Sequence, residues 1–135
     1  MTDKELLEIA RKARDRAYAP YSNYLVGCAV LADGVVYEGA NVENVSFGAV
    51  ICAERAAVSA AAYNGVRNID TVALVTQSSP PVAPCGLCRQ TIQEFATNPE
   101  KLRILIGNLE GEVIETTLAE LLPRGFRKAD LEDAT

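Results

Sequence analysis

The sequence predicts an α/β domain, with helices on the faces of a mixed five-stranded sheet. A β-hairpin signal follows an amphipathic helix, and the later segments alternate between helical and strand patterns. The chain has 135 residues, of which 49% are hydrophobic and 23% charged, and this suits one globular domain over residues 1–135. We expect helices at residues 3–17, 52–63, 85–96 and 118–122, and strands at residues 25–31, 35–39, 71–76, 102–106 and 113–116.

Capping and turn residues mark the first elements. Apolar residues at helical spacing predict the first helix, with Thr2 or Asp3 as its N-cap and Pro20 beyond its end. Asp33 and Gly34 lie between the first two strand patterns, and this pair favours the tight turn of a hairpin.

The later elements have similar signals. The alanine-rich second helix ends at an Asn-Gly pair, which is a strong stop. The apolar run over residues 71–76 is typical of a buried strand. We expect the third helix to turn Leu87, Ile92 and Phe95 inward, and Pro123 to stop the last helix.

Charge and composition exclude several classes of function. With 13 basic and 18 acidic residues the net charge is −5, which disfavours a nucleic-acid partner. The sequence has no histidine, so Ser-His-Asp triads, Cys-His pairs and histidine zinc sites are excluded. It has neither a signal-peptide pattern nor a long apolar run, so we expect no membrane contact and a place in the cytoplasm.

Three of the four cysteines form a pattern typical of a metal site. Cys52 and Cys85 each begin a predicted helix, and Cys88 completes a C-x-x-C pair. The intervening helix, strand and loop are long enough to bring the two helix starts together. Three thiolates favour tetrahedral zinc and leave its fourth position open, as in catalytic sites. We therefore expect one Zn²⁺ per chain, and we interpret Cys28 as a buried small residue of a strand.

Glu54 gives this cysteine pattern a chemical role. It lies two positions after Cys52, where a carboxylate can move protons between water and a substrate without serving as a ligand. Three thiolates and Zn²⁺ together carry one negative charge, which opposes ionisation of water. The helix N-termini and the Arg55 guanidinium offset this charge, and we expect the same role for Arg89 beside Cys88.

A C-x-x-C pair alone also fits a redox pair or half of a structural zinc site. Glu54 and Pro84 favour a different interpretation, because a ligand-x-Glu followed by Pro-Cys-x-x-Cys is the signature of zinc deaminases. A non-enzymatic zinc module would need a fourth ligand, and Cys28 is the spare sulfur. A polynucleotide-editing deaminase would need a basic face, and the net charge of −5 argues against one.

Several longer motifs extend the pattern along the chain. They are Ala19-Pro20-Tyr21-Ser22, Val26-Gly27, Asn41-Val42-Glu43-Asn44, Cys52-Ala53-Glu54-Arg55, Pro84-Cys85-Gly86-Leu87-Cys88-Arg89-Gln90 and Leu121-Leu122-Pro123. On these motifs the chain resembles, over nearly its whole length, the small, homotetrameric, three-cysteine type of cytidine deaminase. The resemblance implies a three-layer α/β/α sandwich, a nucleoside substrate, and a homotetramer whose active sites borrow residues from neighbouring subunits.

The resemblance also assigns roles to single residues. It implies that the three cysteines hold zinc and that Glu54 shuttles the proton. Asn41 and Glu43 match a pair that holds a ribose hydroxyl, and two residues this far apart in an extended segment point the same way. Without the resemblance, a turn and a solvated carboxylate would explain the pair equally well. Phe126 matches an aromatic residue that packs on the base bound by an adjacent subunit.

Three further residues, Tyr24, Phe47 and Ala53, match positions at the substrate. Tyr24 stands where the family usually has phenylalanine, and its hydroxyl needs a partner or solvent. Phe47 replaces a more usual tyrosine, and Val50 stands where a small or polar residue is common. These departures concern the range of substrates rather than the reaction.

The resemblance predicts hydrolysis of cytidine and 2′-deoxycytidine to uridine and 2′-deoxyuridine with release of ammonia, as in pyrimidine salvage. The alternative is a deaminase of the same fold for a modified cytosine nucleoside, such as an N4- or 5-substituted cytidine or blasticidin S. The Pro20-Tyr21-Ser22 motif and Phe126 favour the cytidine type.

Overall fold

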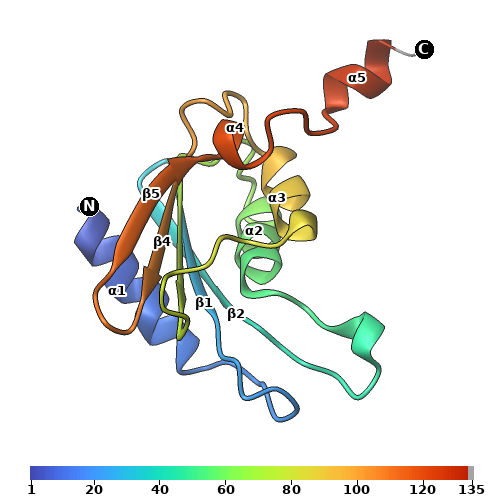
Figure 1. Cartoon of the computed structure of the whole chain (residues 1–135). Coiled ribbons are helices and arrows are strands. Elements are labelled where there is room, and N and C mark those ends of the chain that lie inside the picture. Colours follow the sequence, from blue (N-terminus) through green and yellow to red (C-terminus); the bar gives the residue numbers. More distant parts are fainter. Residues whose placement is uncertain (134–135) are drawn as a thin grey trace.

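The computed structural model describes residues 1–133 and has three layers, with helices on both faces of a mixed sheet (Figure 1). The elements are α1 (Asp3–Arg14), β1 (Gly27–Ala32), β2 (Val35–Ala40), a 3₁₀ turn (Phe47–Ala49), α2 (Ala53–Tyr63), β3 (Thr71–Thr76), α3 (Gly86–Gln93), β4 (Arg103–Asn108), β5 (Val113–Thr117), α4 (Leu118–Leu121) and α5 (Lys128–Asp133). The predicted fold class is confirmed. None of the helices within residues 1–133 is long and apolar enough to cross a membrane.

The five strands form one sheet in the order β2-β1-β3-β4-β5. β3 and β4 are parallel, and all other neighbours are antiparallel. The hairpin between β1 and β2 turns at Asp33 and Gly34, whose φ angles of 50° and 77° lie in the left-handed region that such a two-residue turn requires. All six residues of β3 are buried, because helices cover the centre of the sheet on both faces.

α1 covers one face of the sheet. The sequence predicts Thr2 or Asp3 as the N-cap of this helix. In the structure Thr2 is the N-cap, and it forms a capping box with Glu5. Its buried stripe of Leu6, Ala10 and Ala13 packs on the sheet. The helix ends at Arg14 rather than at residue 17, because the next three N–H groups bond to carbonyls three residues back and tighten the last turn.

α2, α3 and α4 lie on the opposite face (Figure 1). α3 ends at Gln93 rather than at residue 96, because the N–H groups of Phe95 and Ala96 bond to carbonyls three residues back and tighten the last turn. Ile92 and Phe95 pack in the core, but the expectation for Leu87 is wrong, since its side chain is 59% exposed. The inward face of this short helix carries Cys88 and Ile92, which leaves Leu87 outside.

Two glycines let helices approach the sheet more closely than a side chain would allow. A Cβ atom on Gly27 would lie 2.0 Å from the Ala10 carbonyl oxygen of α1. A Cβ atom on Gly39 of β2 would lie 2.5 Å from both the Ala53 oxygen and the Ala57 nitrogen of α2. Gly39 therefore allows the first turn of α2 to rest directly on the edge strand β2.

Candidate active site

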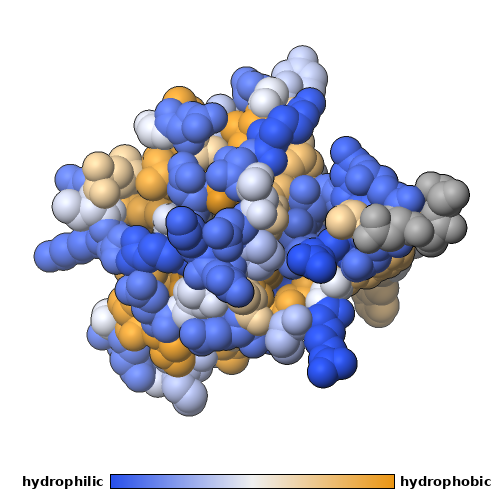
Figure 2. Space-filling view, turned by 90° about the horizontal axis from the view of Figure 1, so that it is seen from above, coloured by the Kyte–Doolittle hydropathy of each residue, from blue (hydrophilic) through white to orange (hydrophobic). Residues whose placement is uncertain are grey.

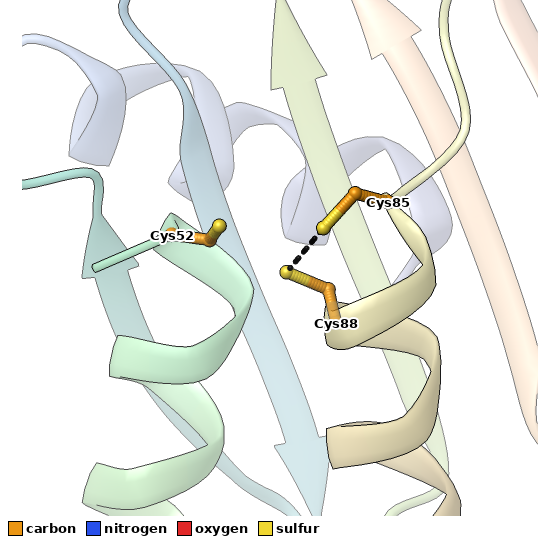
Figure 3. Close-up of side chains that lie close together, drawn as sticks. All are labelled: Cys52, Cys85 and Cys88. Atoms are coloured by element: carbon orange, nitrogen blue, oxygen red, sulfur yellow. Dashed lines mark hydrogen bonds between the residues drawn. The ribbon is translucent and has the colours of Figure 1, made fainter. Parts of the chain in front are cut away.

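Three cysteine side chains converge where α2 and α3 begin side by side (Figure 3). Cys52 is the N-cap of α2, Cys85 is the N-cap of α3, and Cys88 lies in the first turn of α3. Their sulfur atoms all lie within 4.8 Å of one another, and the Cys85 and Cys88 sulfurs are 3.4 Å apart. Cys28 lies in the core, where it is fully buried and where burial raises the pKa of its thiol, so it stands outside this group.

Positive charge favours a thiolate at this site. The interaction with Cys88, together with the charge and N–H groups of Arg55, lowers the pKa of Cys52 to about 5. The same interaction with Cys52, together with burial, raises the pKa of Cys88, so that one of the pair ionises first. The three sulfurs also lie at the N-termini of two helices, whose partial positive charge favours the thiolate form.

The site fits a zinc ion on two observations. Its donor set is three sulfurs from two helix starts, the soft ligands that bind zinc, and it leaves one position of a tetrahedron to water or substrate. Arg55 donates from Nη2 to the Val50 carbonyl (2.6 Å), but its Nε is buried and has no hydrogen-bond partner among the described residues. The Arg55 guanidinium also contributes, after the larger effect of Cys88, to lowering the pKa of Cys52, so it is placed to compensate the charge of a thiolate there.

Glu54 is 5% exposed and lies in the first turn of α2, next to the Cys52 N-cap. Burial raises the pKa of its carboxyl group, which brings the protonated form closer to neutral pH. A carboxyl group with a raised pKa is suited to accept a proton and to return it.

A pocket of about 400 Å³ opens beside the cysteines. Four of the six substrate residues expected from the sequence reach its wall, namely Tyr24, Asn41, Glu43 and Ala53. Cys52, Cys85, Glu54 and Val50 line it as well. A larger hollow of about 670 Å³ lies between α3, α4 and the chain leading to α5, but no cysteine lines it. We therefore take the smaller pocket as the candidate substrate site.

Asn41 and Glu43 hold the loop over residues 21–26. Asn41 accepts the Val26 N–H at Oδ1 (2.8 Å) and donates from Nδ2 to the Tyr24 carbonyl (2.8 Å). Glu43 Oε1 accepts the N–H groups of Tyr21 (2.9 Å) and Ser22 (3.1 Å), and Oε2 accepts the Ser22 hydroxyl. These bonds hold the pKa of Glu43 below its usual range, chiefly through the Ser22 hydroxyl.

Two aromatic residues expected at the substrate lie outside this pocket. Phe47 is 76% exposed and meets the Tyr21 ring edge-on at 6.2 Å, in an adjoining hollow that shares Glu43 with the pocket. Phe126 is 60% exposed and its carbonyl accepts the Gln90 side chain (2.6 Å), but its own chain's pocket does not include it.

Arg89 has contacts that the sequence does not indicate. It donates to the carbonyls of Pro84 (2.7 Å) and Leu121 (2.8 Å). These bonds fix the loop before Cys85 against α4, and the expectation that Arg89 balances charge beside Cys88 stays a prediction.

Ser78 contributes to the site although sequence reasoning missed it. Its hydroxyl shares a hydrogen bond with the Tyr24 hydroxyl, which is the partner that the sequence requires for this phenol. Ser78 lies in a Ser- and Pro-rich loop, a composition that predicts a loop and carries no signal for a contact 54 positions away.

Comparisons with known proteins give consistent results. The family model described as cytidine and deoxycytidylate deaminase zinc-binding region matches residues 1–102. A cytidine deaminase from Sporosarcina psychrophila is 44% identical over 135 residues, which cover 99% of this chain and 98% of the relative. A cytidine deaminase structure from Burkholderia pseudomallei has a TM-score of 0.89 and 43% identity, over 93% of this chain and 100% of that one. A blasticidin-S deaminase from Bacillus cereus is 27% identical over 134 residues, which cover 93% of each chain.

The matched region contains the chemistry of the site. Cys52, Cys85, Cys88 and Glu54 all fall within residues 1–102. The likeness in sequence and in structure extends over almost the whole length of both chains. With three convergent thiols suited to zinc and a buried carboxyl group beside them, the chain belongs to the cytidine deaminase family of zinc-binding hydrolases.

Proposed function

We propose that this enzyme hydrolyses both cytidine and 2′-deoxycytidine, as a step of pyrimidine salvage. The observation that carries the proposal is the 400 Å³ pocket, which combines the cysteines and Glu54 with the polar pair Asn41 and Glu43. The reaction adds water at C4 of the cytosine ring and expels the amino group as ammonia, which leaves the uracil nucleoside.

Each group at the site has its own role in the proposed reaction. When bound, zinc supplies the acidity that makes a water nucleophilic at neutral pH. Glu54 takes one proton from the attacking water and delivers it to the ring nitrogen N3; it then takes the remaining proton of the new C4 hydroxyl and delivers it to the amine, which departs as ammonia while the C4 carbonyl forms. Its burial keeps bulk water from exchanging these protons. The interaction with Cys88 and, after it, Arg55 favour the thiolate form of Cys52.

The polar pair has unused hydrogen-bonding capacity for one sugar hydroxyl. Glu43 accepts three hydrogen bonds of the roughly four that a carboxylate can accept. Asn41 uses one N–H and one lone pair of its amide and keeps one of each. A single hydroxyl that both donates and accepts would satisfy the pair. Both nucleosides keep the 3′-hydroxyl, so this recognition needs no 2′-hydroxyl.

A kinetic panel tests the substrate assignment. We expect cytidine and 2′-deoxycytidine to be deaminated at comparable kcat/KM, measured by the loss of cytosine absorbance and by ammonia release. N4- and 5-substituted cytidines and blasticidin S form the second arm of the panel. A kcat/KM that is highest for a member of this second arm would replace the proposal with the modified-nucleoside alternative.

Arg55→Gln is expected to weaken zinc retention in acid. Arg55 contributes to the lowering of the pKa of Cys52 to about 5, so its loss raises that pKa. Protons then compete with the metal at a higher pH, and the midpoint of zinc release should move upward. Release is measured with a chromogenic chelator across a pH series, with the exposed Arg16→Gln as control. An unchanged midpoint would show that the helix N-termini alone stabilise the thiolate.

We propose a homotetramer in which Phe126 completes the pocket of a neighbouring subunit. Phe126 is exposed on its own chain, and other large apolar side chains are exposed as well, among them Val45, Phe47 and Leu87. Figure 2 shows one face of the molecule, on which apolar patches lie among hydrophilic residues. Such exposed apolar surface suits burial between subunits.

Phe126→Ala is expected to raise the KM for cytidine by about ten- to a hundredfold, because burial of a phenyl ring stabilises a complex by about 1.5–3 kcal/mol. Zinc content should stay unchanged. The KM is measured beside sedimentation velocity, and Tyr63→Ala removes a 91% exposed ring from the end of α2 as control. Full activity per chain in a dilute monomer would contradict shared active sites.

A further inference from the structure

A hydroxyl pair joins two loops that both contribute residues to the pocket wall. Tyr24 belongs to the loop over residues 21–26, and Ser78 belongs to the loop between β3 and α3. Their hydroxyl groups share a hydrogen bond across 54 positions of the sequence. Tyr24 lines the pocket, whereas Ser78 does not. Ser78 therefore affects the pocket only indirectly, through its hydrogen bond to Tyr24.

Ser78 is itself fixed by the sheet. Its N–H donates to the Thr76 hydroxyl at the end of β3 (3.2 Å), and its carbonyl accepts Nδ2 of Asn108 at the end of β4 (3.2 Å). Asn108 in turn is buried, and its Oδ1 accepts the backbone N–H groups of Glu110 and Glu112 (both 3.0 Å). A residue held at its N–H, its carbonyl and its hydroxyl is a rigid support for the tyrosine.

Both loops are also held by hydrogen bonds that do not involve the hydroxyl pair. Arg14, at the end of α1, donates from Nε to the Leu25 carbonyl (3.0 Å) and from Nη2 to Oε1 of Gln77 (3.0 Å). The Tyr24 backbone is held as well, since its N–H donates to the Ser22 hydroxyl (3.0 Å) and its carbonyl accepts the Asn41 amide. Loss of the hydroxyl pair therefore releases the Tyr24 ring and leaves the two loops in place.

We propose that Ser78 is a positioning residue for nucleoside binding, which acts by holding the Tyr24 ring in the pocket wall. The proposal rests on the proposed site for the nucleoside. Tyr24 is bonded to Asn41, on the side of the pocket assigned to the sugar, and among the described residues no hydrogen bond joins it to Glu54 or to the cysteines. The pair therefore sets affinity for the nucleoside, and the proton transfers do not depend on it.

A double-mutant cycle tests the proposal. We expect Ser78→Ala and Tyr24→Phe each to raise the KM for cytidine by about three- to tenfold, the factor that one net hydrogen bond accounts for. kcat should stay within twofold of wild type. The double variant should match either single variant, because both substitutions remove the same bond. Ser78→Thr, which keeps a hydroxyl, should restore much of the affinity.

Matched controls separate this effect from loss of a hydroxyl elsewhere. Tyr63→Phe and Ser59→Ala remove hydroxyls from exposed positions of α2 and should leave the KM unchanged. Thermal melting identifies a variant that folds poorly, and the cycle can then be judged on Tyr24→Phe. Unchanged KM values, multiplicative effects in the double variant, or a fall in kcat larger than the rise in KM would each overturn the proposal. If the wild-type enzyme deaminates neither cytidine nor 2′-deoxycytidine, the proposed function itself is refuted.

Discussion

Glu54→Gln is expected to lower kcat for cytidine by about 10⁴-fold or more while zinc stays bound. A positioned acid or base contributes about 10²–10⁴-fold per proton transfer, and the proposed mechanism uses this carboxylate for more than one transfer. Glutamine keeps the volume and the hydrogen-bonding shape of the side chain but cannot carry the proton. The measurement combines single-turnover kinetics with elemental analysis for zinc.

Glu94→Gln is the matched control for this experiment, because it neutralises an exposed carboxylate at the C-terminal end of α3. It should behave as wild type in both measurements. If kcat of the Glu54→Gln enzyme is within tenfold of the wild-type value, Glu54 does not carry the transferred protons. Loss of zinc in that variant would show instead that the carboxylate supports the metal.

Cys85→Ala should abolish both metal binding and turnover. We expect one zinc ion per chain in the wild-type enzyme and less than about a tenth of that in the variant, since two sulfurs hold zinc far more weakly than three. Because bound zinc stabilises the folded state by mass action, the melting temperature should fall as well. Elemental analysis and calorimetry of the purified proteins provide the measurements.

Cys28→Ala is the control for Cys85→Ala. Cys28 is fully buried and lies outside the group of three sulfurs, so its loss should cost some stability through packing while zinc and activity remain. A Cys28→Ala enzyme that loses its zinc would indicate a closed site with four ligands. Full zinc in Cys85→Ala would contradict the ligand set itself.

The features that the sequence predicts well depend on local chemistry. Asp33 and Gly34 adopt the left-handed backbone that their turn requires, and the hairpin forms around them. Cys52 and Cys85 do begin helices, and the segments between them do bring the two helix starts together. Capping preferences and the ligand chemistry of zinc act over a few residues, so a single sequence is enough to recognise them.

The features that the sequence does not reveal depend on contacts between distant segments. Arg89 bonds with the Leu121 carbonyl, and Ser78 with Tyr24, over separations that no periodic pattern encodes. Leu87 is exposed because α3 is too short to bury a second face. α5 went unpredicted because few apolar residues mark it, and in Figure 1 it extends away from the layers that bury the other helices.

The close approach at Gly39 has a consequence for the precision of the metal site. A methyl group at position 39 would lie 2.5 Å from the Ala53 oxygen, where ordinary contact begins near 3.4 Å. The first turn of α2, and the Cys52 sulfur with it, would have to move by much of that difference. Metal–sulfur bonds tolerate only about 0.2 Å. The mechanical tolerance of the zinc site is therefore set in an edge strand, by a residue that has no side chain to contribute to the chemistry.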